Sequence, residues 1–294
     1  KRIYFMSFTD DLKNVFTRSG NGLMRIILIN VIVYLLVNVL GELIKFSGNG
    51  ASLIYWLALP GNVSLAITHA WAIITYMFLH EGLLHILFNM LWLYWLGKIF
   101  VEYVGSKRLI GVYILGGISG GLLFLLTAWV FPMQFHYTFL LGASAGVMAV
   151  VIAIAVLVPD YMIHLMFLGG VKLKYLALAS FILTSILDIS QNTGGKIAHI
   201  GGALFGLLFM MQHKKGRDLT TPVVSFLNWV VSLFSGNSKI KVTYRRKPSN
   251  EDYNSNQKAK QQKIDAILDK ISKAGYESLT KEEKDYLFKA SKEN

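Results

Sequence analysis

Long apolar segments separated by short polar connections dominate the first 212 residues of the sequence. A helix needs about 20 apolar residues to cross the hydrocarbon core of a bilayer. Six segments have this character: 24–44, 81–101, 108–131, 143–158, 173–189 and 196–212. The fourth and the sixth are short, which is typical of helices that begin below the membrane surface. The pattern predicts an all-α fold in which residues 24–212 form a polytopic membrane bundle of six transmembrane helices.

Small residues recur at four-residue spacing in the third and sixth predicted helices. They are Gly116 with Gly120, Gly117 with Gly121, and Ala198 with Gly202 and Gly206. Small side chains on one helix face let two backbones approach closely inside a membrane. Both helices are therefore predicted to pack tightly against neighbours. The connection at 45–80 is also largely apolar, and its Tyr55, Trp56 and Trp71 favour a loop at the depth of the lipid headgroups.

The segment 213–258 is predicted to hold an interfacial helix and a linker. In the stretch TPVVSFLNWVVSLFSG the polar residues fall on one face of a helix. Thr221 is suited to cap this helix, with Pro222 at its first helical position. The helix is too short to span a bilayer, so its apolar face is expected to lie in the membrane interface.

The last segment, 259–294, is predicted to be a small helical domain. Apolar residues at helical spacing run up to Gly275, which ends the first helix. Thr280 and Glu283 have the spacing of a capping box and open a final helix. The sequence therefore predicts a helical hairpin as the C-terminal tail.

Basic residues are concentrated in alternate connections of the predicted bundle. They lie in the N-terminal segment 1–23, after the second helix, after the fourth and after the sixth, whereas the opposite connections contain only Lys45 and Lys196. Basic connections mark the cytoplasmic side of a membrane protein. The sequence therefore predicts a multi-pass protein of the cell (plasma or inner) membrane, with both the 1–23 segment and the C-terminal tail in the cytoplasm.

Composition supports the membrane class and narrows the chemistry. The chain is 54% hydrophobic and only 16% charged. Its net charge of +12 is compatible with nucleic-acid binding, but the sequence lacks the basic and aromatic pattern of such modules. The predicted partner is the lipid bilayer, not nucleic acid. The absence of cysteine excludes disulfides, thiolate catalysis and cysteine–zinc sites.

Ser144 raises the first question about chemistry. It opens the fourth predicted helix within the sequence Gly-Ala-Ser-Ala-Gly at residues 142–146. Small residues and serine serve helix packing, so a structural role is one reading. The other reading is a nucleophile at the start of a helix. The other polar side chains of the bundle are needed to decide between a packing role and a catalytic role for Ser144.

Metal and aspartyl chemistry are disfavoured. His80, Glu81 and His85 superficially match a zinc-protease motif, but histidines five residues apart lie on different faces of a helix. An intramembrane aspartyl protease needs two carboxylates within the spans, and only Asp160 and Asp188 are near them, both at helix ends. No metal site and no cofactor are predicted.

Three polar side chains stand out in otherwise apolar helices. His85 and Asn89 are four residues apart and share a face, where they serve either packing or the stabilisation of an oxyanion. His199 lies between Ala198 and Gly202, so its helix is able to press against the helix that begins with Ser144. A single intramembrane histidine is more often a hydrogen-bonded partner than a catalyst, yet imidazole is the usual base for a serine hydroxyl. No carboxylate stands out as the third member of a catalytic triad with a serine and a histidine.

Together these motifs resemble those of the rhomboid intramembrane serine proteases. The motif residues are His85 and Asn89 in the second helix, Gly142 and Ser144 opening the fourth, and Ala198, His199, Gly202 and Gly206 in the sixth. The resemblance implies a Ser144–His199 catalytic dyad. It also implies an oxyanion hole formed by the Ser144 backbone N–H with the side chains of His85 and Asn89. Glu102 resembles a structural acid of the family, and the tail resembles a short helical domain found behind some bacterial rhomboids.

The chain departs from the family pattern at three positions. Ala145 follows the serine where glycine is frequent, and Ala72 follows Trp71 where arginine is frequent. Met148 stands where many members place a tyrosine against the catalytic histidine. These changes are expected to restrict the turn slightly, to remove an anchor of the outer loop and to leave His199 without the tyrosine that would orient it, although the Met148 sulfur is able to pack on its ring. None of them removes a catalytic group.

The resemblance implies an intramembrane serine endopeptidase that cleaves the transmembrane segments of membrane proteins, with single-pass helices as substrates. A non-catalytic rhomboid-like protein that binds transmembrane helices is the alternative, but such a protein should lack Ser144 or His199. A transporter is a second alternative, which would require charged groups within the spans and similar halves. The predicted spans contain almost no charged groups, and the two halves of the chain do not look alike.

Overall fold

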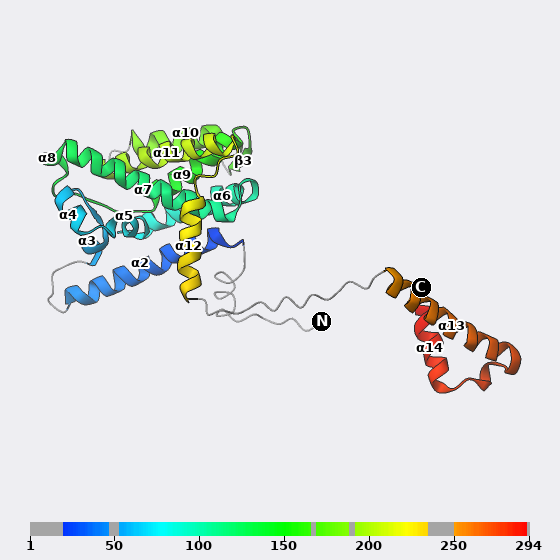
Figure 1. Cartoon of the computed structure of the whole chain (residues 1–294). Helices are drawn as coiled ribbons and strands as arrows, with labels where there is room; N and C mark the ends of the chain where they lie inside the picture. Colours follow the sequence, from blue (N-terminus) through cyan, green and yellow to red (C-terminus); the bar gives the residue numbers. More distant parts are fainter. Residues whose placement is uncertain (1–19, 47–52, 166–168, 188–191, 235–249, 293–294) are drawn as a thin grey trace. The chain divides into compact units, whose positions relative to one another are not determined.

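The computed structural model of the chain describes residues 20–46, 53–165, 169–187, 192–234 and 250–292 (Figure 1). The predictions that concern residues 1–19, Asp188 and the linker segment 235–249 lie outside the described residues. The chain divides into two compact units, Lys1–Gly236 and Asn237–Asn294.

Each of the six predicted membrane segments is a helix. They are α2 (Gly22–Phe46), α6 (Leu83–Tyr103), α7 (Ser106–Val130), α9 (Ser144–Leu157), α10 (Leu173–Ser185) and α11 (Thr193–His213). Among the described residues, four helices are long and apolar enough to cross a membrane: α2 as far as Gly41, α6, α7 and α11. The all-α, polytopic membrane fold is confirmed. The count of six crossings stays a prediction, because α9 and α10 are shorter apolar helices.

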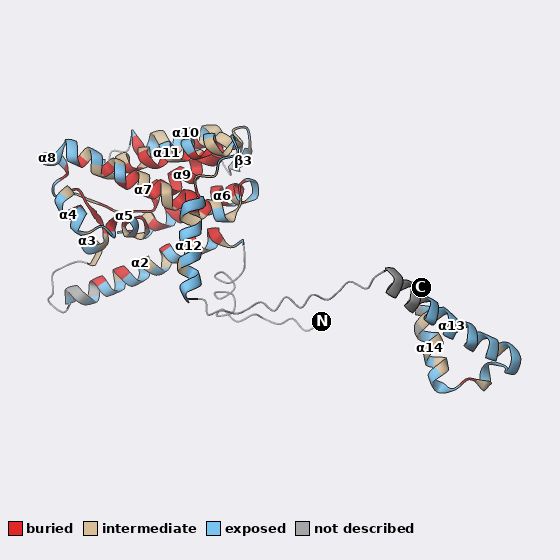
Figure 2. Cartoon of the chain, in the orientation of Figure 1, coloured by how far each residue is buried: buried red, intermediate tan, exposed pale blue. Residues whose placement is uncertain are grey.

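Helix α9 forms much of the core of the bundle (Figure 2). Ten of its 14 residues are buried. Helices α7 and α11 pack against it through small residues, among them Gly116 and Gly120 of α7 and Gly202 and Gly206 of α11. A methyl group at Gly202 would overlap the carbonyl group of Ala145, and one at Gly206 would overlap that of Ala149. The backbones of α9 and α11 are therefore in direct contact, which only small residues permit.

The described part of the connection between α2 and α6, residues 53–82, has more secondary structure than the loop that the sequence predicts. It contains α3 (Leu53–Leu57), β1 (Leu59–Pro60), α4 (Val63–Thr68), α5 (Ala72–Thr75) and the short 3-10 helix η1 (Tyr76–Phe78). Tyr55 and Trp56 are exposed, as residues at headgroup depth would be, but Leu59 and Tyr76 are fully buried. Part of this connection thus belongs to the core of the bundle.

Two short antiparallel strand pairs complete the membrane unit. Strand β1 pairs with β2 (Phe139–Leu140), which follows the short helix α8 (Pro132–Phe135). Strands β3 (Met162–Leu165) and β4 (Gly169–Lys172) form a hairpin between α9 and α10. Beside it, Asp160 pairs with Lys172 and Lys174 at 3.0 and 2.9 Å. The hydrogen bond from Lys174 lowers the pKa of Asp160 below its ordinary value.

Helix α12 (Thr221–Phe234) follows the bundle. It begins at Thr221, so Pro222 is its second residue and the predicted start is wrong by one position. Before it, Asp218 accepts a hydrogen bond from Arg108 at 2.7 Å and one from the Thr220 N–H at 2.9 Å. These bonds attach the start of α12 to the start of α7. An interfacial position for α12 stays a prediction.

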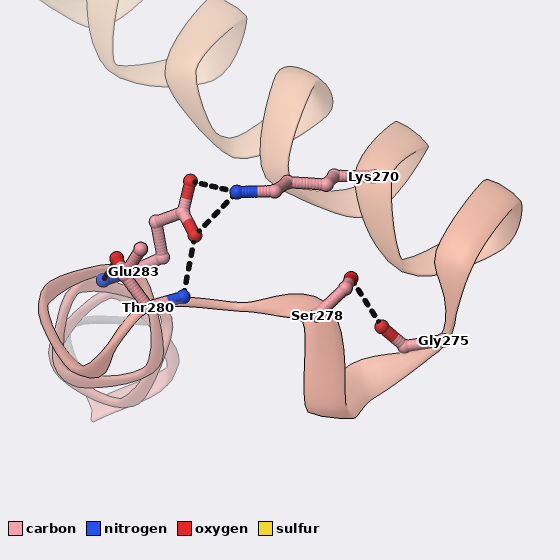
Figure 3. A network of polar contacts seen from close by, with 5 residues as sticks. All are labelled: Lys270, Gly275, Ser278, Thr280 and Glu283. Carbon is pink, nitrogen blue, oxygen red and sulfur yellow. Dashed lines mark hydrogen bonds and ion pairs between the residues drawn. The ribbon is translucent and has the colours of Figure 1, made fainter.

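The C-terminal unit is a helical hairpin of α13 (Asn250–Ala274), the 3-10 turn η2 (Tyr276–Ser278) and α14 (Lys281–Lys292). Helix α13 begins nine residues before the predicted start at 259. Gly275 follows it with φ 76°, a conformation that favours glycine. The predicted capping box is present: the Thr280 N–H donates to Glu283 at 2.7 Å, and Lys270 pairs with the same carboxylate (Figure 3). This carboxylate therefore ties the two helices of the hairpin together.

Candidate active site

Ser144 is the first residue of α9. The segment before it is held in place by Leu59 and Tyr76, which lie between α2 and α6. Leu140 pairs with Leu59 across the β1–β2 ladder, and the Gly142 N–H donates to the Tyr76 carbonyl at 2.9 Å. The Tyr76 hydroxyl donates in turn to the Gly117 carbonyl in α7 at 2.5 Å. The serine therefore sits at a helix start that is fixed from two sides.

Gly142 has a structural reason to be glycine. Its φ of 126° is one that side chains with a Cβ rarely adopt. A Cβ at this position would lie 3.1 Å from the His85 ring and 3.6 Å from Ser144 Oγ. The serine oxygen and the imidazole of His85 therefore border the same small space, which the missing side chain leaves open.

His199 lies in the second turn of α11, whose start is capped by Asn192. The Asn192 Oδ1 accepts a hydrogen bond from the Gly195 N–H at 2.9 Å, which satisfies one of the free amides at the helix start. His199 Nδ1 is 3.3 Å from the carbonyl oxygen of Thr184 in α10. One residue of the next turn, Gly202, is in contact with Ala145 of α9. The imidazole is thus placed on the helix that packs against the start of α9.

All four predicted polar site residues border one cavity of about 580 Å³. Helix α6 contributes Leu84, His85, Phe88, Asn89 and Trp92; α9 contributes Ser144, Val147, Met148 and Val151, with Leu141 before it; α10 contributes Ser180, Leu183 and Thr184; and α11 contributes Gly195 and His199, with Asn192 before it. The cavity lies near the starts of α6, α9 and α11 and the end of α10. The basic connections at 103–108 and 158–174 are at the other ends of these helices. A cavity with a few polar groups among apolar walls is typical of a ligand or substrate site.

His80 and His85 are closer together than the sequence argument assumes. Helix α6 begins at Leu83, so His80 precedes it, and the two rings lie 4.9 Å apart and nearly perpendicular. His80 is buried. No group of three or more His, Asp or Glu side chains among the described residues has the arrangement of a metal site. The helical spacing is therefore the wrong reason for setting zinc aside, because His80 is not part of α6.

A second, more polar cavity of about 520 Å³ adjoins the first. His85, Leu141 and Asn192 border both cavities. The second cavity is also lined by Glu81, Phe131, Gln134, Phe135, Thr138, Phe139, Thr193 and Gly194. It connects the start of α6 with the segment around α8 and the start of α11.

All three residues that depart from the family pattern are buried. Ala145 and Ala72 are fully buried, and neither position has a positive φ. Trp71 donates a hydrogen bond from Nε1 to the Trp56 carbonyl at 3.1 Å, and the two indole rings lie 4.9 Å apart. The connection is therefore anchored by aromatic contact beside Ala72. Met148 borders the same cavity as His199.

Several residues that line the cavity were not predicted from the sequence. Trp92, Val151 and Thr184 line the cavity, but a sequence does not show whether an apolar or weakly polar side chain of a membrane helix faces lipid or a cavity. Tyr76, which supports the segment before Ser144, has a sequence feature that could have drawn attention to it. It is a polar aromatic residue in an apolar stretch, and such a hydroxyl usually finds a partner when it is buried.

Comparison with known proteins adds the family. A model of the rhomboid domain matches residues 68–214, which is half of the chain, and a family of unknown function matches residues 250–293. The chain is similar to rhomboid protease GlpG of Klebsiella pneumoniae (33% identical over 96 residues), Salmonella typhi (30% over 104) and Serratia proteamaculans (28% over 110). These matches cover 33–37% of this chain and 32–36% of the relatives. The chain therefore spans about a third of the length of the curated relatives that it matches.

Proposed function

Because this chain belongs to the rhomboid family, we propose that it is a serine endopeptidase that cleaves transmembrane segments of membrane proteins within the bilayer. One observation carries the proposal: Ser144, His199, His85 and Asn89 come from three helices and border the same cavity. These residue types supply a nucleophile, a base and hydrogen-bond donors, which are the parts that acyl transfer needs. The relatives bear the name rhomboid protease, which agrees with this chemistry.

In the proposed mechanism Ser144 Oγ attacks the scissile carbonyl carbon of the substrate, and His199 accepts the hydroxyl proton. The tetrahedral intermediate collapses, the peptide C–N bond breaks, and His199 gives the proton to the leaving amine. Water then attacks the acyl-enzyme ester by the same route in reverse and releases Ser144. A hydrogen bond between Ser144 and His199 is part of this proposal. The contact of α9 with α11 supports it by holding the two helices close together.

The negative charge that develops on the carbonyl oxygen needs donors that are already in place. We assign this role to the Ser144 backbone N–H and to the side chains of His85 and Asn89. The amide of a residue at the start of α9 lies at the positive end of the helix dipole. The His85 ring already borders the space beside Ser144 Oγ that Gly142 leaves open.

The site also has to admit water and an unwound substrate. The position of the cavity, away from the basic connections, favours an opening toward the outer side, with both termini in the cytoplasm. We also propose a plasma or inner membrane location. The non-helical backbone before Ser144 lines the cavity at Leu141, where it meets the requirement that irregular backbone at membrane depth faces a cavity.

The test uses the full chain reconstituted in lipid vesicles with a panel of single-pass membrane proteins. We expect cleavage by the natural sequence and its loss in Ser144→Ala and in His199→Ala. A fluorophosphonate probe should label Ser144 in the natural sequence and not in Ser144→Ala. Cleavage that persists in Ser144→Ala would reject the serine mechanism, and binding of substrates without any cleavage would favour the non-catalytic alternative.

The oxyanion assignment has its own test. Asn89→Ala should lower kcat by about 10²-fold or less, which is the usual contribution of one donor of this kind. The inactive Ser144→Ala variant and the double variant with Asn89→Ala should bind substrate with the same Kd. An unchanged kcat would remove Asn89 from the oxyanion hole.

A further inference from the structure

Glu81 lies at the edge of the candidate active site and has no role in the chemistry described above. It borders the second cavity, together with His85, at the start of α6. Its side chain is exposed and makes no ion pair or hydrogen bond with the residues that the structure describes. No lysine or arginine of the described part of the chain therefore pairs with the Glu81 carboxyl group.

The rest of this cavity suits a cation. Its other described lining residues include no lysine or arginine, and Lys196 in the first turn of α11 does not border it. Gln134 and Thr138 supply neutral oxygen acceptors. The Thr138 hydroxyl already donates to the Phe135 carbonyl at 2.8 Å, so its oxygen remains able to accept a hydrogen bond. A carboxylate with neutral acceptors nearby matches the three donors of an ammonium group.

The cavity is also within reach of the bond to be cut. It shares His85, Leu141 and Asn192 with the cavity that holds Ser144. The His85 ring lies 3.1 Å, and Ser144 Oγ 3.6 Å, from the space beside Gly142. A residue a few positions from the scissile bond is therefore able to place a long side chain in the second cavity, and the flexible stem of lysine is well suited to this.

We propose that Glu81 is a specificity-determining residue that selects substrates with a lysine or arginine within a few residues of the scissile bond. This inference rests on the proposed function, since it concerns the substrates of the same site. Basic residues are rare on the outer side of most membrane segments, so the preference would separate a small set of substrates from the rest. Electrostatic repulsion would disfavour substrates with an acidic residue at the same place.

The experiment uses the full chain in vesicles of phosphatidylcholine and phosphatidylglycerol, which contain no primary amine headgroup. The cleavage site of one single-pass substrate is located by mass spectrometry. Each of the four residues on either side is then replaced in turn by Lys, Gln and Glu, and kcat/KM is measured. We expect at least one position where Lys exceeds Gln by about five-fold, as for a favourable exposed ion pair.

Variants of the enzyme connect that preference to Glu81. In Glu81→Gln, kcat/KM for the Lys substrate divided by kcat/KM for the Gln substrate should fall to about one. In Glu81→Lys, the Glu substrate should have the highest kcat/KM. Glu102→Gln, at the other end of α6, removes the same charge and should retain the Lys preference. A Lys preference that survives in Glu81→Gln, or cleavage that depends on Ser144 but is equal for Lys, Gln and Glu at every position, would overturn the inference. No Ser144-dependent cleavage of any substrate would instead count against the proposed function.

Discussion

The contact between α9 and α11 makes a quantitative prediction for Gly202→Ala. A methyl group at this position would lie 2.8 Å from the carbonyl carbon of Ala145 and still closer to its oxygen, whereas ordinary contacts of a Cβ begin at 3.4 Å. The atoms in the way belong to the backbone, so no side chain is able to rotate aside. The two helices therefore have to separate by about half an ångström or more.

That displacement is large for an active site whose parts come from both helices. Productive geometry tolerates about 0.5 Å, and a misplacement of about 1 Å costs on the order of 10²-fold in rate. Because His199 precedes Gly202 by less than one turn, we expect kcat to fall by about 10- to 100-fold. Overpacking should also lower the free energy of unfolding by about 1–3 kcal/mol.

The assay measures both quantities, kcat on a single-pass substrate in vesicles and thermal unfolding in detergent. Gly206→Ala is the matched control, since its methyl group would overlap Ala149 in the same way, one turn further from the cavity. Gly206→Ala should lower the free energy of unfolding as much as Gly202→Ala does, but it should lower kcat less. Gly41→Ala, with nothing within 4 Å of the new methyl group, should not lose stability. Equal rate losses at positions 202 and 206, or no loss at 202, would refute the argument that this contact aligns the site.

Three other predictions follow from contacts outside this interface. Gly142→Ala should lower stability by about 1–3 kcal/mol because of its positive φ, and should abolish cleavage because the methyl group meets the His85 ring; thermal unfolding and product formation measure the two effects. Tyr76→Phe removes one buried hydrogen bond and should cost about 1 kcal/mol in the same unfolding assay; an unchanged melting temperature would contradict it. The hydrogen bond from the Thr280 N–H, and next the one from Lys270, lower the pKa of the Glu283 carboxyl below its ordinary 4.5. Its stabilisation is therefore fully present above pH 4.5 and lost as the pH falls below it, so hydrogen exchange at the Thr280 amide should accelerate there, and Glu283→Gln should remove this pH dependence.

Hydropathy alone located all six helices of the bundle, because an apolar segment of the right length has few alternatives in a membrane. Polar side chains inside those helices pointed to the candidate site for a similar reason. His85 and Asn89 are costly at membrane depth, and their four-residue spacing places them on one face. The structure places both on the wall of the cavity that also holds Ser144.

What the sequence did not reveal depends on contacts between distant segments. The β1–β2 pair consists of two residues on each strand, so it has no periodicity that a pattern could detect. Its effect is large nonetheless, because it fixes the backbone that leads to Ser144. Likewise, the sequence of the connection at 45–80 predicts an apolar loop, yet Tyr76 within it supports the segment before the serine through hydrogen bonds to Gly142 and Gly117.

Ala145 shows why a departure from a family pattern is hard to judge by itself. Alanine after the serine is expected to restrict the turn, yet the residue is part of α9 and has no positive φ, so the backbone carries no strain there. Its methyl group needs space instead, and the neighbouring helix provides it. A Cβ on Gly120 would lie 2.7 Å from the Ala145 methyl carbon, so a glycine at position 120 leaves room for the alanine. The residue after the serine and the glycine on α7 therefore have to be read as a pair, which only their spatial contact reveals.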